Sequence, residues 1–321
     1  MCNHLNTNTK KTTARGSIKI SAVVVIVYGI SQASAMPLLG SDLASFTVLG
    51  ASTVTNVATS VIVGNVGDWS SGGANAITGF LSAPGVAVSD PQVTGGQVHS
   101  GTALAQSGQA QLTTAITNLG SLGPGTLLSA DLVGLSLLPG VYTVPAGTTN
   151  LSGALTLDGQ GNANAAWIFQ MTSTLITSPN SVVNLINTGA GAGVFWNVGS
   201  SATLDSNTTF IGNILALSSI SMNATATNDC GRALASTGAV ALIQNSLSGN
   251  CSGALANSSS LSGGLDVTTT AEGITAVNIL PYAPVIGGGG NGGNVPEPTT
   301  WVLLALGVAG FLLRRPIVKS G

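Results

Sequence analysis

Charged side chains are scarce in this sequence. Its 321 residues include 8 Lys or Arg and 10 Asp or Glu, a formal net charge of −2. Seven of the eight basic residues lie in the two terminal segments, so that between Met36 and Val295 only Arg232 stands against nine acidic residues, a local charge of −8. Nucleic-acid binding needs several Lys or Arg against phosphates. The composition therefore predicts no nucleic-acid partner.

Patterns for catalysis and for metal or cofactor binding are also missing. A lyase needs a base near clustered carboxylates, and a hydrolase needs two carboxylates about 5–10 Å apart. Asp158 and Asp205 could meet, but each is more typical of a residue that caps a turn. His99 has no visible catalytic or metal-binding partner, and the run GGGGNGG lacks the strand–loop–helix context of a nucleotide loop. We therefore predict no enzymatic activity, no metal and no cofactor.

The N-terminal residues 1–35 have the pattern of a secretory signal peptide. A basic region, Lys10–Lys19, precedes the apolar run Ile20–Ile30, and Ala33-Ser34-Ala35 supplies a small-residue cleavage site. A membrane anchor is the alternative, but 11 apolar residues are too short for a hydrocarbon core of roughly 30 Å. We expect export and cleavage by signal peptidase after Ala35.

Cysteine is rare as well, and its positions are informative. Removal of the signal peptide removes Cys2 and leaves Cys230 and Cys251 in an oxidising compartment. A disulfide between them would close a loop of about 20 residues and contribute roughly 3 kcal/mol. A metal-binding pair is the alternative, although no His or further Cys lies nearby. We predict the disulfide.

The mature region, residues 36–286, is dominated by short apolar runs. Between Ala165 and Leu217 they recur every 12 to 16 residues, which is too close for helical crossovers. Only Val98–Leu119, residues 98–119, has helical periodicity, with Leu104, Leu112 and Ile116 expected to face a sheet. The sequence thus predicts an all-β solenoid with one long helix alongside, and with earlier strands at Phe46–Leu49, Thr53–Val57 and Ser60–Val63.

The outer face of these strands has almost no charge. The stretch Ala165–Leu217 contains a single Asp, Asp205, and no Lys, Arg, Glu or His. Soluble sheets normally carry charge on the face that meets water. A face of Thr, Ser, Asn and Ala therefore requires a functional explanation.

The C-terminal segments point to sorting at the cell envelope. Residues 287–294 (GGGGNGGN) are predicted to be a linker, and residues 295–321 contain Val295-Pro296-Glu297-Pro298, an apolar run and Arg314-Arg315. This order resembles the PEP-CTERM sorting signal of Gram-negative bacteria. The resemblance implies transient membrane insertion of the C-terminal helix, cleavage by an exosortase, and delivery outside the cell or to its surface. A permanent C-terminal anchor is the alternative.

Several segments of the mature region resemble the ice-binding-like family, also called DUF3494. They are LPGVYTV (Leu138–Val144), WIFQMTSTL (Trp167–Leu175), VFWNVGSSATL (Val194–Leu204), FIGNILALSSISM (Phe210–Met222) and GRALASTGAVAL (Gly231–Leu242). The resemblance implies an irregular, discontinuous right-handed β-helix with one long α-helix packed alongside. It also implies that one flat face adsorbs to ice, without a regular Thr-x-Thr array.

An ice-binding surface should be flat, stiff and uncharged. Threonine suits it because its β-branched side chain has few rotamers and carries both a methyl and a hydroxyl group. The residues expected to face outward, of which more than half should share one face, are Thr53, Thr55, Thr78, Thr94, Thr174, Thr203, Thr208, Ser219 and Thr237. We therefore predict a secreted or surface-attached protein with an ice crystal as its partner. The alternative is a structural or adhesive module of the extracellular matrix, in contact with exopolysaccharide.

Overall fold

The computed structural model describes residues 35–57, 59–70, 76–252, 255, 260–269 and 275–285. All of the predicted signal peptide except Ala35, the Gly-rich linker and the sorting segment lie outside these residues. Within them the chain is mostly β-strand, with two α-helices, α1 (Gly40–Ala44) and α2 (Ala103–Gly120). None of the helices described is long and apolar enough to cross a membrane.

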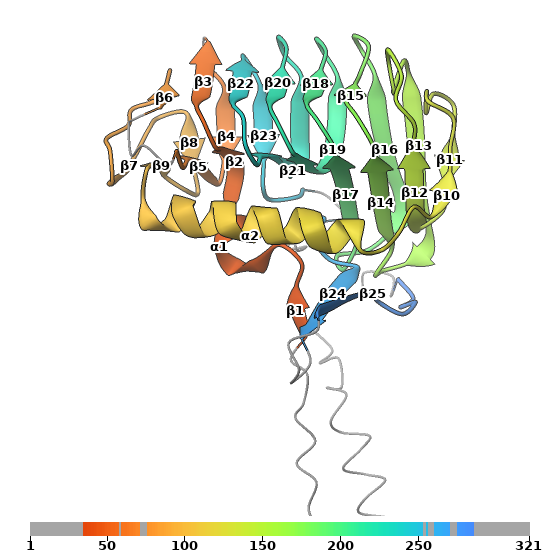
Figure 1. Cartoon of the computed structure of the whole chain (residues 1–321). Coiled ribbons are helices and arrows are strands. Elements are labelled where there is room, and N and C mark those ends of the chain that lie inside the picture. Colours follow the sequence, from red (N-terminus) through yellow and green to blue (C-terminus); the bar gives the residue numbers. More distant parts are fainter. Residues whose placement is uncertain are drawn as a thin grey trace, which may run out of the picture.

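Most strands belong to a three-sided stack, to which each turn of the chain contributes one strand per side (Figure 1). We call the sides the helix-covered face, the six-stranded face and the third face. The helix-covered face contains β10 (Thr126–Leu127), β12 (Gly140–Val144), β14 (Ala166–Met171), β17 (Gly193–Val198), the second halves of β19 (Thr209–Ala216) and β21 (Thr227–Ala235), β2 (Phe46–Gly50), β5 (Asn65–Asp68), β9 (Val98–Ser100) and β7 (Ala87–Val88).

The other two faces carry shorter strands. The six-stranded face contains, in spatial order, β15 (Leu175–Ile176), β18 (Ala202–Leu204), β20 (Ile220–Met222), β22 (Val240–Ile243), β3 (Val54–Val57) and β6 (Ile77–Thr78). The third face contains β11 (Ser136–Leu137), β13 (Ala154–Asn162), β16 (Val182–Thr188), the first halves of β19 and β21, β23 (Ser246–Ser248), β4 (Val61–Val63) and β8 (Val93–Thr94).

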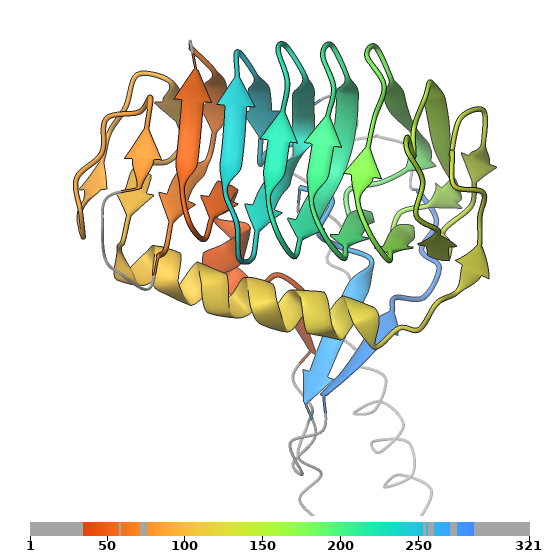
Figure 2. The same ribbon diagram turned by 45° about the horizontal axis from the view of Figure 1, so that its top comes forward.

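The order of strands in space differs from their order in sequence. Strand β2 pairs in parallel with β21, so the first turn of the chain lies against one of the last. From there the chain runs outward to β9 at one end, and α2 then carries it along the stack to β10 at the other end (Figure 2). The later turns return to the middle and close against β2.

Helix α2 begins at Ala103, five residues later than the sequence pattern predicts. Val98–Ser100 instead forms β9, which pairs with β5, and Gly101 adopts a positive φ of 61° that breaks the chain direction. The hydroxyl oxygen of Thr102 then accepts a hydrogen bond from Ala105 N, which caps the helix. The buried side of α2 includes Ala105, Gly108, Gln109, Leu112, Ala115 and Leu119.

Aromatic rings stack through the interior of the three-sided stack. Tyr142, Phe169 and Trp196 are register partners in β12, β14 and β17, with ring centroids 5.9 Å and then 4.0 Å apart. Phe210 continues the series at 4.8 Å from Trp196. Because Trp196 Nε1 donates to Ile211 O at 3.0 Å, its only polar atom is satisfied inside the core.

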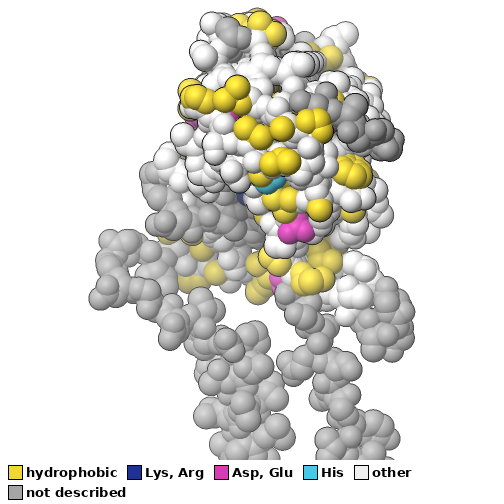
Figure 3. Space-filling model, turned by 90° about the vertical axis from the view of Figure 1, so that its left-hand side faces the viewer, with side chains coloured by type: hydrophobic (Ala, Val, Ile, Leu, Met, Phe, Trp, Pro, Cys, Tyr) yellow, Lys and Arg dark blue, Asp and Glu magenta, His cyan; other side chains and the backbone are white. Residues whose placement is uncertain are grey.

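The two ends of the stack and the ribbon below it complete the molecule. At the end formed by β6 to β9, hydrophobic side chains gather with few charged ones between them (Figure 3), and Leu81 and Val86 are exposed there. Strands β1 (Ala35–Pro37), β24 (Leu265–Thr269) and β25 (Thr275–Ile279) form a separate antiparallel ribbon. It projects from the side of the stack away from the six-stranded face (Figure 1).

Candidate functional site

The strands of the six-stranded face lie toward the viewer in Figure 2, and two rows of their side chains point outward. The strand register places one row at Ile176, Thr203, Ser221, Ala241, Thr55 and Thr78. Backbone hydrogen bonds between neighbouring strands, such as those from Leu175 N to Ser201 O and from Val54 N to Ala76 O, align a second row that lies two residues earlier in each strand. That row contains Thr174, Ser201, Ser219, Ala239, Thr53 and Ala76.

These twelve positions share one chemistry. Five are Thr, three are Ser, three are Ala and one is Ile, so none carries a charge. All are partly or fully exposed. Because neighbouring strands lie about 4.8 Å apart, each row repeats a methyl or hydroxyl group at that spacing across the face.

The rows point outward because the residues between them fill the core. Leu175, Ala202, Ile220, Val240, Val54 and Ile77 occupy one register line and are all buried. Successive side chains of a strand point to opposite sides of a sheet. Because this apolar line is buried, the residues on both sides of it must face solvent.

Six of the nine residues expected to share a face lie in these two rows. They are Thr53, Thr55, Thr78, Thr174, Thr203 and Ser219. Thr94 lies on the third face, where it pairs with Val63 of β4. Thr237 is exposed at the corner between the helix-covered and six-stranded faces, and its hydroxyl donates to Leu217 O at 2.6 Å.

The expectation that Thr208 faces outward is wrong. Its side chain is fully buried at the corner before β19, where its hydroxyl lies 2.8 Å from that of Thr177. The alternation that holds within a strand is reset at this corner, because Asn207 adopts a positive φ of 58°. Thr208 thus holds two neighbouring turns together inside the stack.

The sequence reading missed six members of the two rows: Ser201, Ser221, Ala76, Ala239, Ala241 and Ile176. A signal for them exists. Each strand of the face centres on a three-residue unit in which an apolar residue stands between two outward ones, as in Ser219-Ile220-Ser221 and Thr53-Val54-Thr55. The unit is too short and too common to be found without the register that aligns its copies.

The corner that borders the face on the side of the third face carries mostly uncharged residues and one Asp. Asn180, Asn207, Thr225 and Gln244 all adopt positive φ at the corner shared with the third face. Asp205 lies at this corner, where it accepts hydrogen bonds from Asn223 Nδ2 at 2.9 Å and Ser206 N at 2.7 Å. These bonds, that of Asn223 first, lower the pKa of the Asp205 carboxyl. Asp205 therefore caps a turn at the edge of the face, outside its two rows.

The remaining polar groups of the described residues do not assemble a reaction centre. Asp158 caps a different turn, with Gln160 N at 3.0 Å and Asn187 Nδ2 at 2.9 Å. His99 packs edge-on against Phe46, and burial lowers its pKa. Among the described residues, no three His, Cys, Asp or Glu side chains gather as a metal site. A groove of about 480 Å³ beside α2, lined in part by Trp69 and Gln106, holds no charged residue.

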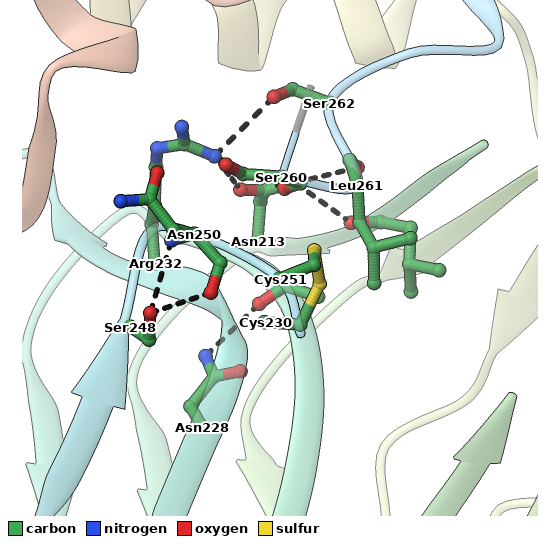
Figure 4. Close-up of a disulfide and its surroundings, with 12 residues drawn as sticks. Asn213, Asn228, Cys230, Arg232, Ser248, Asn250, Cys251, Ser260, Leu261 and Ser262 are labelled. Atoms are coloured by element: carbon green, nitrogen blue, oxygen red, sulfur yellow. Dashed lines mark hydrogen bonds between the residues drawn. A yellow bond between two sulfur atoms is a disulfide. The ribbon is translucent and has the colours of Figure 1, made fainter. Parts of the chain in front are cut away.

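Arg232 is a structural cation rather than a surface charge. It is almost completely buried, and burial lowers its pKa to about 10. Its guanidinium donates to Asn213 Oδ1 at 2.8 Å, Ser260 O at 3.2 Å and Ser262 Oγ at 3.3 Å (Figure 4). It also donates to Ala44 O at 2.8 Å. None of these acceptors is a carboxylate. The Arg232 side chain thereby holds the end of α1 and the segment around Ser260–Ser262 against the stack.

Cys230 and Cys251 form the predicted disulfide (Figure 4). Their Cα atoms are 4.6 Å apart, at a sequence separation of 21 residues. Cys230 follows Asn228 in β21, on the third face, and is buried. The bridge therefore closes the last turn of the stack at a corner away from the six-stranded face.

Comparison with known proteins identifies the two regions of the chain. Residues 48–248 match the ice-binding-like family, and residues 294–315 match the PEP-CTERM protein-sorting motif. The sorting motif indicates export and an extracellular or surface location. The chain is 41% identical to an ice-binding protein from Nostoc sp. (strain HG1) over 222 residues, which cover 69% of this chain and 77% of that one.

Further relatives are similar in sequence, and one solved structure is similar in fold. Ice-binding protein K3-B1 of Typhula ishikariensis is 29% identical over 63% of this chain and 86% of its own length. The crystal structure of an ice-binding protein from Antarctomyces psychrotrophicus superposes with a TM-score of 0.57 at 31% identity, over 68% of this chain and all of that one. Since the family match spans more than half of the sequence, this chain belongs to the ice-binding-like family.

Proposed function

We propose that this protein binds ice through its six-stranded face and thereby inhibits ice growth or recrystallisation. The observation that carries the proposal is the uncharged surface of twelve positions in register, eleven of them Thr, Ser or Ala and one Ile. The relatives named above are ice-binding proteins, which supports the same ligand for this chain.

The chemistry of the face suits a solid made of water. Ice offers neither charge nor a cleft, so affinity must come from many weak contacts over a wide, stiff area. Thr and Ser hydroxyl groups can bond to ordered water, while methyl groups favour it by avoiding competing hydrogen bonds. A charged group would keep its own hydration shell, because removing that shell costs several kcal/mol.

The proposed contact surface comprises both rows. Thr53, Thr55, Thr78, Thr174, Thr203 and Ser219 remain in it, joined by Ser201, Ser221, Ile176 and the three alanines at 76, 239 and 241. Thr94, Thr208 and Thr237 are not included, because they lie on the third face, in the core and at a corner.

We propose further that the stack is an irregular right-handed β-helix, with α2 as its one long helix. Parallel pairing between successive turns supports a helical path, and crossover connections between parallel strands are right-handed in almost all proteins. The sorting motif supports cleavage by an exosortase near Val295–Pro298 in a Gram-negative host.

The proposal is tested by partitioning the chain spanning residues 36–286 into a slowly growing ice front. The wild type should enter ice, and Thr203→Lys in the middle of the face should be left in the liquid. Thr209→Lys is the matched control, since Thr209 is exposed in the first half of β19 on the third face. Exclusion of the wild type from ice would contradict the proposal and favour a matrix module.

A further inference from the structure

The last described segment of the chain is fastened to one corner of the stack. We call Leu280–Val285 the strap. Val285 N donates to Gly161 O at 2.8 Å, Ala163 N donates to Ala283 O at 2.6 Å, and Ala283 N donates to Asn162 Oδ1 at 3.0 Å. These bonds hold the strap along the turn that follows β13.

Additional contacts fix the same stretch. Asn164 Nδ2 donates to Pro281 O at 3.2 Å, and the Tyr282 hydroxyl donates to Gly161 O at 3.3 Å. Further back, Val194 N donates to Leu261 O at 2.8 Å, and Gly263 N donates to Ala192 O at 3.1 Å. The chain after the disulfide therefore meets this corner twice before it leaves the described structure.

The corner that holds the strap is the one opposite the six-stranded face. The Gly161–Asn164 turn joins β13 of the third face to β14 of the helix-covered face, so it touches neither edge of the six-stranded face. In Figure 1 the ribbon of β1, β24 and β25 points the same way, and Figure 2 shows the six-stranded face turned toward the viewer above it. Whatever continues beyond Val285 starts from the side away from the proposed ice contact.

Few residues separate this exit from the sorting motif. The match to the motif begins at residue 294, so only eight residues follow Val285 before it. A chain spans at most about 3.5 Å per residue, which limits the reach of this segment to roughly 30 Å. With so short a connection, the side on which it leaves the stack decides which face a tethered molecule can offer.

We propose that the protein acts while attached through its C-terminal segment, as an anchor that holds its carrier surface to ice. The strap at the corner opposite the six-stranded face turns that face outward, away from the attachment. Attachment near the face would instead press it against the carrier. This inference rests on the proposed function, to which it adds the working orientation.

The test couples the chain from Met36 to Gly321 to beads at three alternative positions and measures retention of the beads by ice. Asn291→Cys places the link in the segment after the strap. Ala190→Cys places it at the strap corner, where Ala190 is exposed and Gly189 lies beside Ala163. Thr237→Cys places it at an exposed corner of the six-stranded face. Equal coupling is confirmed by the amount of protein per bead.

Beads linked through residues 291 and 190 should be retained alike, and beads linked through residue 237 at least about tenfold less, the factor that corresponds to a loss of about 1.4 kcal/mol. Equal retention at all three positions would overturn the orientation. So would failure of the beads linked through residue 291 while the uncoupled chain still enters ice. If the uncoupled chain itself stays out of ice, the proposed function fails, and this inference fails with it.

Discussion

The helix-covered face and the six-stranded face are built by the same turns of the chain, yet they meet different surroundings. Leu49, Leu215 and Leu234 point outward from the helix-covered face and are completely buried beneath α2 and its neighbours. The corresponding side chains of the six-stranded face are Thr, Ser and Ala, with a single Ile at position 176. Large apolar side chains need a cover, whereas small ones with hydroxyl groups tolerate water. The choice of outer residue thus decides which side α2 can occupy.

The same charge placed on each of the two faces should have very different effects on stability. Leu234→Lys puts an unpaired ammonium under α2, and we expect the free energy of unfolding to fall by several kcal/mol, a large part of the 5–15 kcal/mol typical of a domain. Ser221→Lys should change it by no more than about 0.5 kcal/mol, because its side chain stays in water. Urea denaturation measures both. Equal destabilisation would show that the six-stranded face is also covered.

Removal of the disulfide separates the stability of the stack from the surface of the face. The double variant Cys230→Ser/Cys251→Ser should lose about 3 kcal/mol, the loop-closure value for 21 residues. Its uptake into ice near 0 °C should remain that of the wild type, because the bridge lies at a corner away from the six-stranded face. Thermal unfolding and ice partitioning of one sample give both numbers. Loss of uptake in a sample that is still folded would link the corner to the face.

The corner beside the six-stranded face can be stabilised. Thr225 adopts φ 62°, a conformation costly for a β-branched residue, while the equivalent positions 180 and 207 of two other turns are Asn. Thr225→Asn should therefore raise the free energy of unfolding by about 0.5–1 kcal/mol. The reverse change, Asn207→Thr, should lower it by a similar amount. A decrease for Thr225→Asn would mean that the Thr225 hydroxyl bond to Asn207 outweighs the backbone strain.

Among the changes considered, acidification should lower stability the least, through the corner residues Asp158 and Asp205. Hydrogen bonds lower the pKa of Asp158, mainly through Gln160 N, and that of Asp205, mainly through Asn223. A carboxyl whose folded pKa is depressed stabilises the protein above its unfolded pKa, near 3.8, and loses that contribution as pH falls through the folded value. Thermal midpoints of the wild type should fall more between pH 6 and pH 3 than those of the double variant Asp158→Asn/Asp205→Asn.

The double variant is the necessary reference, because the Asp68 carboxyl makes stability change with pH in the opposite direction. Burial raises the pKa of the Asp68 carboxyl, so its contribution is present at low pH and is lost as pH rises through that value. The difference between wild type and double variant isolates the two corners. Parallel curves for the two proteins would show that the corner bonds add nothing measurable.

Much of this fold could be predicted from local pattern. Phe46–Leu49 was expected as a strand and lies within β2, and the apolar runs expected between Ala165 and Leu217 include β14 and β17, because continuous apolar runs of that length suit strands buried on both sides. The start of α2 was harder. Val98–Ser100 has helical neighbours in sequence, but its backbone pairs with β5, a contact from a distant segment.

The candidate site shows the same division at the level of single residues. Composition was enough to predict an outer surface short of charge, since Arg232 is the only Lys or Arg between Met36 and Val295, and to predict which residue types would line the strands. It could place Thr55 and Thr203 outward, because alternation acts within a strand. Only the tertiary structure decided that these two residues share a row with Ser221 and Ala241, and that Thr208 turns inward at its corner. Register between strands depends on hydrogen bonds from segments far apart in the chain, and no local pattern contains that information.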